Sequence, residues 1–296
     1  MHRQAYLLLL ATTLFWGGNT IAGKLAVGHV SPMLLPTLRW AIAFCCLYAL
    51  GQHRLAADWH LVRPRLLYLA MMGFFGFAAF NLAIYSALLF TSAVNASIEH
   101  AGIPMVIFGL NFLIFRQRVF AGQMIGFVLT LAGVVLTATH GDLRNLLRLD
   151  LNAGDALVLV AIIVYAGYTV ALRFRPAVHW QSFMIVLSAS ACLTSIPFAL
   201  VEYATGNAIW PDVLGWGCVL FTAIFPSLLS QVFYMRGVEL IGANRASLFI
   251  NLVPIFGTLL SILILGETLH LYHVVAIVLA LGGIWLAERS GRRVRS

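Results

Sequence analysis

Long apolar runs separated by short polar gaps fill the chain. Most runs extend over about 20 residues, the length that an α-helix needs to cross the hydrocarbon core of a bilayer. The gaps between them are too short to hold a soluble domain. The pattern predicts an all-α membrane protein with ten transmembrane helices, at residues 4–27, 33–50, 66–90, 92–115, 122–139, 154–173, 180–203, 212–236, 244–265 and 271–289.

Composition supports this class. Charged residues make up 9% of the chain, against roughly 25% in an ordinary soluble domain. Hydrophobic residues reach 61%, and the mean hydropathy is +0.95. A water-soluble protein of 296 residues needs more polar surface than this composition can supply.

The net charge of +8 is a topology signal. An even number of crossings places both termini on one side, and fourteen arginines fall in the segments on that side. The opposite side holds Arg144 and Arg148. Because positive residues collect on the cytoplasmic side, both termini are expected in the cytoplasm, and no nucleic acid partner is expected. The basic tail, residues 290–296, is expected to act as a stop-transfer anchor, with contact to anionic lipid headgroups as the alternative.

Two halves of the chain resemble each other. An offset of 149 pairs Trp16 with Tyr165, and an offset of 150 pairs Pro104 with Pro254. We therefore expect two domains, at residues 1–140 and 150–289. Each half carries five expected helices, so the second half crosses the membrane in the opposite sense. Inverted repeats of this kind are typical of secondary transporters, whose substrate site lies between the halves.

The second half, with "YMRGVELIGANRASLFINLVPIFGTLLSILILGETL", closely resembles the EamA domain of the drug/metabolite transporter superfamily. The first half resembles it through "WGGNTIAGK" and "AVNASIEHAGIP". The resemblance implies a ten-helix exporter of small metabolites, most like the YddG-type amino-acid exporters. One departure concerns Gly266 and Glu267, whose first-half counterparts are Arg116 and Gln117.

Glu99 and His100 stand side by side inside an apolar run. Glu99 is expected about 12 Å below the outer boundary, where a charged carboxylate costs a few kcal/mol. Three roles remain open: it could carry a proton inward during export, contact the substrate, or bond to a neighbouring helix. His100 points about 100° away from Glu99 on a helix, and could relay a proton through a water or serve in packing.

Aromatic and amide side chains near the expected midplane are candidates for a solute-binding cavity. A cavity with apolar walls and a few hydroxyl and amide groups suits an amphipathic solute that has to leave water. The alternative is ordinary helix packing. With Glu99 and His100, the predicted cavity residues are Trp16, Asn19, Asn81, Tyr85, Tyr165, Tyr168 and Asn251.

Other positions predict local structural features such as kinks, caps and close helix contacts. Pro104 and Pro254 lie in corresponding helices and are candidate hinges, or static kinks. Glu267 is expected to cap the helix that follows it. His270 and His273 form an H-x-x-H pair without a third ligand, so no metal site is expected. Small residues predict close helix contacts along residues 122–133 and 276–287.

The function favoured by these features is alternating-access export of amino acids, including aromatic and hydrophobic ones, or of similar small metabolites. One rival is a membrane enzyme that acts on lipid-linked substrates, with Glu99 and His100 as acid and base. A second is a non-transporting partner subunit. No catalytic or nucleotide-binding motif occurs, so an enzyme and a cofactor are not expected.

The expected location is the plasma membrane of a bacterium, that is, its inner membrane. The expected partners are a small-molecule substrate, membrane lipid and, as a coupling ion, the proton if Glu99 carries one. A monomer or a weak homodimer is expected.

Overall fold

Helices make up the structure of the chain. A computed structural model describes residues 2–116, 121–138, 141–142, 152–241 and 249–292, and no strand occurs in that part. The α-helices are α1 (His2–Leu25), α2 (Leu34–Val62), α3 (Leu66–Gly73), α4 (Phe80–Ala87), α5 (Ala93–Glu99), α6 (Ile103–Phe115), α7 (Ala121–Ala138), α9 (Ala153–Ala171), α10 (Trp180–Ala204), α11 (Val213–Ile224), α12 (Ser230–Ile241), α14 (Val253–Leu265) and α15 (Leu271–Arg292). Short 3₁₀ or π segments join several of them, namely η1 (Arg63–Arg65), η2 (Phe74–Ala79), η3 (His100–Gly102), η4 (Leu172–Phe174) and η5 (Phe225–Leu229).

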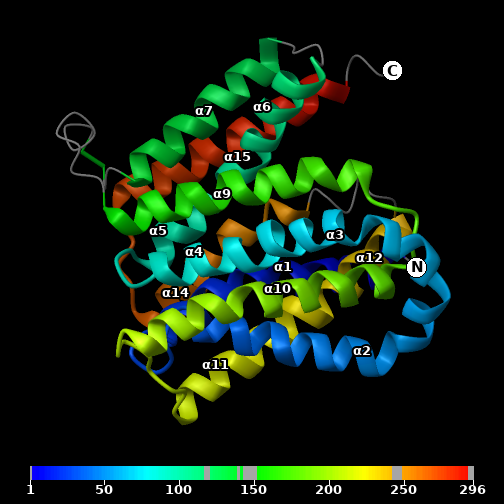
Figure 1. Cartoon of the computed structure of the whole chain (residues 1–296). Coiled ribbons are helices and arrows are strands. Elements are labelled where there is room, and N and C mark those ends of the chain that lie inside the picture. The colour runs from blue at the N-terminus through cyan, green and yellow to red at the C-terminus, as the bar shows by residue number, and fades with distance from the viewer. Residues whose placement is uncertain (1, 117–120, 139–140, 143–151, 242–248, 293–296) are drawn as a thin grey trace.

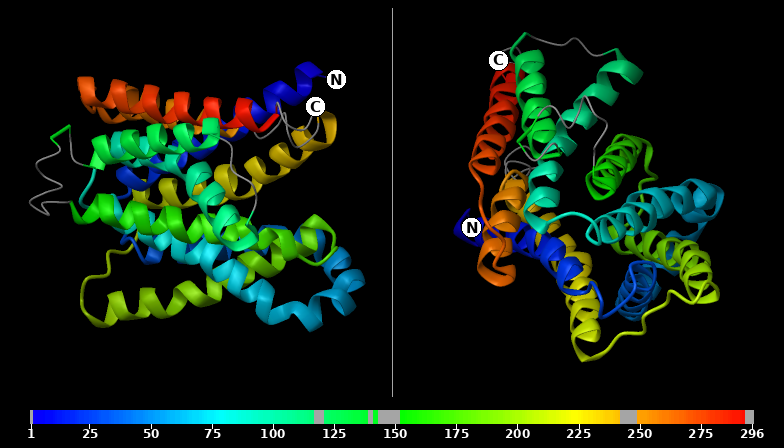
Figure 2. Two further views of the ribbon diagram at one scale, coloured as in Figure 1. Left: turned by 90° about the horizontal axis from the view of Figure 1, so that it is seen from above. Right: turned by 90° about the vertical axis from the view of Figure 1, so that its left-hand side faces the viewer.

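The long helices form one bundle, and both termini lie at the same end of it (Figure 1). The α2–α3 turn lies at that end too. α6, α7 and α15 form a group at one edge, which the end-on view also shows (Figure 2). Of the last expected segment, residues 290–296, only 290–292 are described, and they continue α15.

Six helical stretches of the described chain are long and apolar enough to cross a membrane. One of them, Leu34–Ala87, has 54 residues and turns back on itself after α2 (Figure 1). Shorter apolar helices cover Met124–Thr137, Val253–Leu265 and Leu271–Leu286. The chain is therefore a multi-pass, all-helical membrane protein.

One predicted boundary is wrong. The second expected span stops at residue 50, but α2 continues to Val62 and passes into the 3₁₀ turn η1. The polar residues after residue 50 do not end the helix, because polar residues continue a helix when they face water. Pro64, in the first turn of η1, falls where the α-helix stops.

The halves share a break at corresponding positions. α5 ends at Glu99 and η3 follows, before α6 begins at Ile103. In the second half a turn at Asn251 and Leu252 precedes α14. Pro104 and Pro254 occupy the first turn after each break, where a proline N–H would have no helical partner in any case. Each proline therefore lies in the first turn of an α-helical segment, after the 3₁₀ turn η3 in the first half and after a turn in the second. Whether they act as hinges or as static kinks stays a prediction.

The halves also share a π-helical segment. η2 interrupts the third expected helix, and η5 interrupts the eighth at nearly the same place in its repeat. A π turn holds an extra residue and so rotates the side chains beyond it relative to those before it. Such bulges occur often at functional sites, and both of these contribute to the polar cluster described below.

The two halves are intertwined. α1, the first helix of the chain, packs on α12 and α14 of the second half, and α9 packs on α4 and α6 of the first half. α2 packs along α10. The first helix of each half thus lies against the third and fourth expected helices of the other, as a pseudo-two-fold arrangement requires.

Small residues bring α7 and α15 into close contact. A Cβ on Gly283 would lie 2.5 Å from the Gly126 carbonyl oxygen, and one on Gly133 would lie 2.7 Å from the Ala276 carbonyl oxygen. Thr130 donates a hydrogen bond of 3.2 Å to the carbonyl of Ala280. The predicted ridges of small residues therefore form this interface.

Replacing Gly283 by alanine should destabilise the protein by about 1–3 kcal/mol, because backbone has to move to admit the methyl group. Gly282→Ala is the matched control: its Cβ would meet nothing within 4 Å, and alanine favours a helix over glycine by up to about 1 kcal/mol. Thermal unfolding in detergent should place the Gly283 variant below the parent and the Gly282 variant level with it or above. Equal melting temperatures for the two variants would contradict this packing.

Candidate functional site

Arg39 is buried inside the bundle, 5% exposed, at the second turn of α2. No Asp or Glu oxygen of the described chain lies within 4.0 Å of its guanidinium. A charged side chain at such a depth is costly unless it meets polar partners, and those that persist mark functional sites by default. Arg39 is therefore the starting point for the site.

The partners of Arg39 are neutral and come from three other segments. Its Nε donates to Ser227 Oγ of η5 at 2.7 Å. Its Nη1 lies 2.8 Å from the Oδ1 atoms of both Asn19 on α1 and Asn81 on α4, and it also bonds to the Tyr85 hydroxyl. The structure records no hydrogen bond from Nη2 to any described residue.

The π segments hold these acceptors in place. Asn81 follows η2, and its Nδ2 donates to the carbonyl of Phe77 within η2 at 2.6 Å. Ser227 lies within η5 and donates to the carbonyl of Thr222 at 2.9 Å. Tyr85 donates to Asn19 Oδ1 at 3.0 Å. Both halves of the chain thus contribute to one polar cluster, consisting of Arg39, Asn19, Asn81, Tyr85 and Ser227.

Aromatic rings lead from this cluster to His100. The Arg39 guanidinium carbon lies 5.0 Å from the ring centre of Trp40, which stacks on Phe77 at 4.5 Å. The path continues through ring pairs at 4.9–5.8 Å, namely Phe77–Tyr168, Tyr168–Tyr165, Tyr165–Phe80 and Phe80–His100. Tyr165 and Tyr168 therefore share one face of α9, and that face meets the first half of the chain.

Glu99 lies at the end of α5, 0% exposed, and neither carboxylate oxygen has a hydrogen-bond partner in the described structure. His100 does not supply one: its Nδ1 lies 2.5 Å from the carbonyl of Ala96. The neighbouring acid and imidazole are thus not joined directly. An ionised carboxylate in such surroundings is unfavourable, so burial favours the neutral acid.

Glu267 caps a helix other than the predicted one. Its carboxylate accepts from the backbone N–H groups of Ala93 and Val94, at 2.9 and 2.8 Å, and so caps α5 rather than α15. The negative charge meets the positive end of the α5 dipole. Nearby, Lys24 of α1 donates to the carbonyls of Leu88 and Thr91, at 2.8 and 2.7 Å. These contacts close the end of the bundle opposite the termini.

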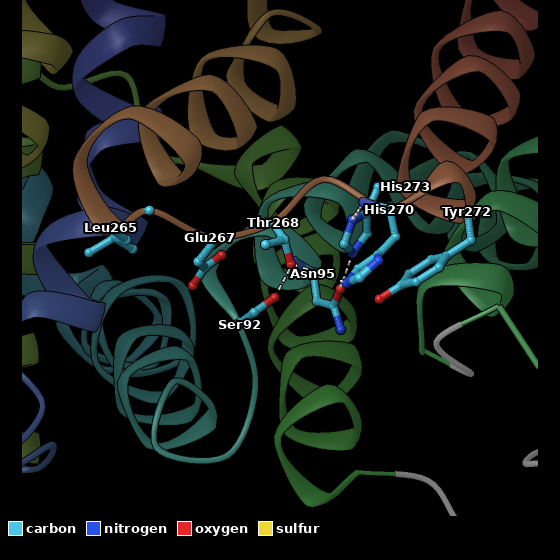
Figure 3. A pocket seen from close by; sticks show the side chains of 9 residues that line it. Ser92, Asn95, Leu265, Glu267, Thr268, His270, Tyr272 and His273 are labelled. Atoms are coloured by element: carbon cyan, nitrogen blue, oxygen red, sulfur yellow. Dashed lines mark hydrogen bonds between the residues drawn. The ribbon is translucent and has the colours of Figure 1, made fainter.

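A pocket of about 410 Å³ opens at that same end, between α5 and the α14–α15 connection (Figure 3). His273 Nε2 lies 2.9 Å from Asn95 Oδ1, which joins the two halves across its wall. His270 and Glu267 also line it, whereas Arg39 and Glu99 do not. No group of three His, Cys, Asp or Glu residues suited to a metal occurs in the described chain.

The predicted cavity residues divide into groups. Asn19, Asn81 and Tyr85 meet at Arg39, and Tyr165 and Tyr168 line the aromatic path. Trp16 is half-buried and belongs to neither group. Its Nε1 donates to the carbonyl of Pro226 at 3.3 Å, and its ring lies 5.6 Å from that of Tyr234. Asn251 is half-buried in the turn before α14.

Sequence reasoning missed Arg39 and Ser227. Arg39 lies within the expected span 33–50 but is not among the predicted cavity residues, although an intramembrane charge is itself a signal of a site. Ser227 follows Pro226 in a run of apolar residues, and nothing in its local sequence indicates a partner 188 positions away.

Comparison with known proteins gives a consistent result. A profile of the EamA-like transporter family matches residues 3–139 and again residues 152–288. The chain is 24% identical to an uncharacterised transporter of Bacillus subtilis, YyaM, over 97% of this chain and 94% of the relative. It is 26% identical to an uncharacterised transporter of Archaeoglobus fulgidus, over 97% and 99% of the two chains. It is 23% identical to a probable amino-acid metabolite efflux pump of Salmonella typhimurium, over 100% and 98%.

A solved crystal structure of a protein superimposes with a TM-score of 0.63 at 21% identity, over 99% of both chains. At this identity the likeness concerns the fold.

Removing the Ser227 hydroxyl should destabilise the protein by about 1–3 kcal/mol, because the Arg39 Nε–H then lacks its acceptor in a buried place. The control is Ser261→Ala: Ser261 is equally buried, but its hydroxyl donates only to the Gly257 carbonyl of its own helix, at 2.8 Å. Melting temperatures in detergent should fall clearly for Ser227→Ala and little for Ser261→Ala. A larger fall for Ser261→Ala would show that the contact with Arg39 contributes little.

Proposed function

Because the chain belongs to the EamA-like transporter family, within the drug/metabolite transporter superfamily, we propose that it is an alternating-access exporter of amino acids or similar small metabolites. The observation that carries the proposal is the neutral polar cluster around Arg39, which both halves of the chain build inside an apolar bundle. The name of the Salmonella relative, a probable amino-acid metabolite efflux pump, agrees with it.

We propose ten membrane crossings in two inverted halves, with both termini in the cytoplasm. The six long helical stretches support this number when Leu34–Ala87 is counted as two crossings and the three shorter apolar helices as one each. The arginine excess at the termini supports the orientation, in the inner membrane of a bacterium. Labelling of a C-terminal tag from outside intact cells would overturn it.

We propose that the solute binds between the Arg39 cluster and the aromatic path, among Asn19, Asn81, Tyr85, Tyr165 and Tyr168. The cluster offers hydrogen bonds and the path offers an apolar face, which together suit an amphipathic solute. Trp16, Asn251 and His100 are proposed as the outer parts of the same cavity.

We propose that the helices change direction during alternating access at the breaks before α6 and α14. A proline follows each break. Backbone groups at these breaks lack regular i→i−4 hydrogen bonds, so the helices can change direction there. Pro104 and Pro254 limit how far the helices can re-form across each break, since proline cannot donate a hydrogen bond.

Transport is favoured over catalysis by the geometry at Glu99. An enzyme that used Glu99 and His100 as an acid–base pair would need both groups within hydrogen-bond reach of one substrate. Instead, Glu99 is 0% exposed, His100 Nδ1 is engaged by the Ala96 carbonyl, and neither residue lines the 410 Å³ pocket.

The buried carboxyl of Glu99 is proposed as the proton carrier that couples export to inward proton movement. It lies beside a break in the helix, so a change of conformation there can move it from closed surroundings to water. Protonation outside and release inside then accompany each cycle.

Flux measured in proteoliposomes tests the export proposal. Vesicles holding the purified parent should release amino acids faster than protein-free vesicles do. Tyr165→Ala should alter the order in which large and small amino acids are released, because it removes a ring from the aromatic path. Tyr203→Ala, at an exposed position 63% accessible on α10, should leave that order unchanged. Identical release profiles for Tyr165→Ala and the parent would move the cavity elsewhere.

Proton coupling is tested with the Glu99→Gln variant. Parent export should accelerate when the receiving side is made acidic, because the inward gradient then drives the cycle. Glu99→Gln keeps the size of the side chain but cannot release a proton, so the export rate of this variant should not depend on the pH gradient. Glu202→Gln, near the end of α10, serves as the control and should respond like the parent. A parent that shows no response would exclude coupling through Glu99.

A further inference from the structure

The charge of Arg39 is not balanced within the bundle. The guanidinium bonds to two amide oxygens, a phenol and a serine, all of which are neutral. The one ion pair of the described chain, between His29 and Asp212, lies at an exposed end. Glu99, a buried acid of opposite charge when ionised, has no hydrogen bond to Arg39 or to any other described residue. The positive charge of the buried Arg39 is thus stabilised only by neutral polar groups.

The partners leave one edge of the guanidinium open. A guanidinium has N–H donors on Nε, Nη1 and Nη2, and a carboxylate binds two of them side by side. Here Nε and Nη1 are engaged, and Nη2 has no recorded hydrogen bond to the described chain. The Asn19 side chain presents its Oδ1 to Arg39 and Tyr85, so its Nδ2 donor lies beside the same group.

On these grounds we propose that Arg39 is the anchor for the carboxylate of the transported solute, with Nη2 donating to it and Asn19 Nδ2 as a second donor. This rests on the proposed transport function and names the part of the solute that is recognised. A carboxylate suits the site better than a phosphate dianion does, because a single guanidinium supplies one positive charge. A solute with only a cationic group would be repelled.

The anchor is closed on one side in this structure. The hollow that borders Tyr85, between the ends of α1 and α2, has a volume of about 10 Å³. A single water needs about that much space, so no solute passes there without a change of conformation. This hollow therefore offers a solute no route to Tyr85 in this structure.

The test compares each amino acid with its primary amide, which lacks the carboxylate, and adds one carboxylate that lacks the amino group. Proteoliposomes are loaded with an equimolar mixture of L-phenylalanine, L-leucine and L-methionine together with their primary amides, and with 3-phenylpropanoate. Release of each solute is followed by mass spectrometry against protein-free vesicles. The three acids and 3-phenylpropanoate should leave at least about tenfold faster than the amides, the difference expected when a charge-assisted contact is lost.

A variant with an internal carboxylate gives the sharper test. Asn81→Asp places an acid beside Arg39 Nη1, where Asn81 Oδ1 now lies at 2.8 Å, and should fold because it completes an ion pair. It should slow release of the acids at least about tenfold and speed release of the amides, which no longer meet a net positive charge. Arg63→Gln, at an exposed position in η1, should behave as the parent does.

The outcomes separate the proposed carboxylate anchor from the proposed export function. Equal release of acids and amides by the parent would overturn the anchor while leaving export intact. Unchanged preference in the monodisperse Asn81→Asp variant would overturn it too. If the parent releases no solute of the mixture faster than empty vesicles, both the export proposal and the anchor fail.

Discussion

The burial of one guanidinium constrains the arrangement of four segments. Arg39 cannot lie among apolar helices without polar partners, because charged donors there cost several kcal/mol when they are left unsatisfied. Its acceptors come from α1, α4 and η5, so these three segments have to reach α2 at one depth. The π segments make this possible, since an extra residue in a turn redirects Asn81 and Ser227 without ending their helices.

The same devices occur twice, once in each half. Each repeat has a π segment in its third helix, and a break followed by proline in its fourth. Each first helix also packs against these two helices of the opposite repeat. The π segment and the turn before the proline in one half therefore lie against the first helix of the other, so the two halves repeat the same contacts.

The charged side chains of the bundle differ in the hydrogen-bond partners that they have. Near the end opposite the termini, Glu267 is satisfied by two backbone N–H groups and Lys24 by two carbonyls, so both act as ties between helices. Deeper in the bundle, Arg39 has neutral partners only, and the Glu99 carboxylate has no described partner. An internal ion pair between them would have satisfied both charges. Keeping them apart leaves one cation and one acid without a compensating charge, as the proposed solute anchor and the proposed proton carrier require.

The membrane class, the positions of most helices and the doubled architecture follow from the sequence itself, because they depend on apolar run length, arginine bias and self-similarity at one offset. Asn19, Asn81, Tyr85, Tyr165 and Tyr168 could be singled out in the same way, as polar or aromatic groups in apolar helices. The tertiary structure alone decided that the first three meet at Arg39, that Ser227 completes the cluster, and that Glu267 caps α5. These contacts join residues 20–188 positions apart, and no local periodicity encodes which faces of distant helices meet. That choice is made by the packing of the whole bundle, in which most buried polar groups have a hydrogen-bond partner.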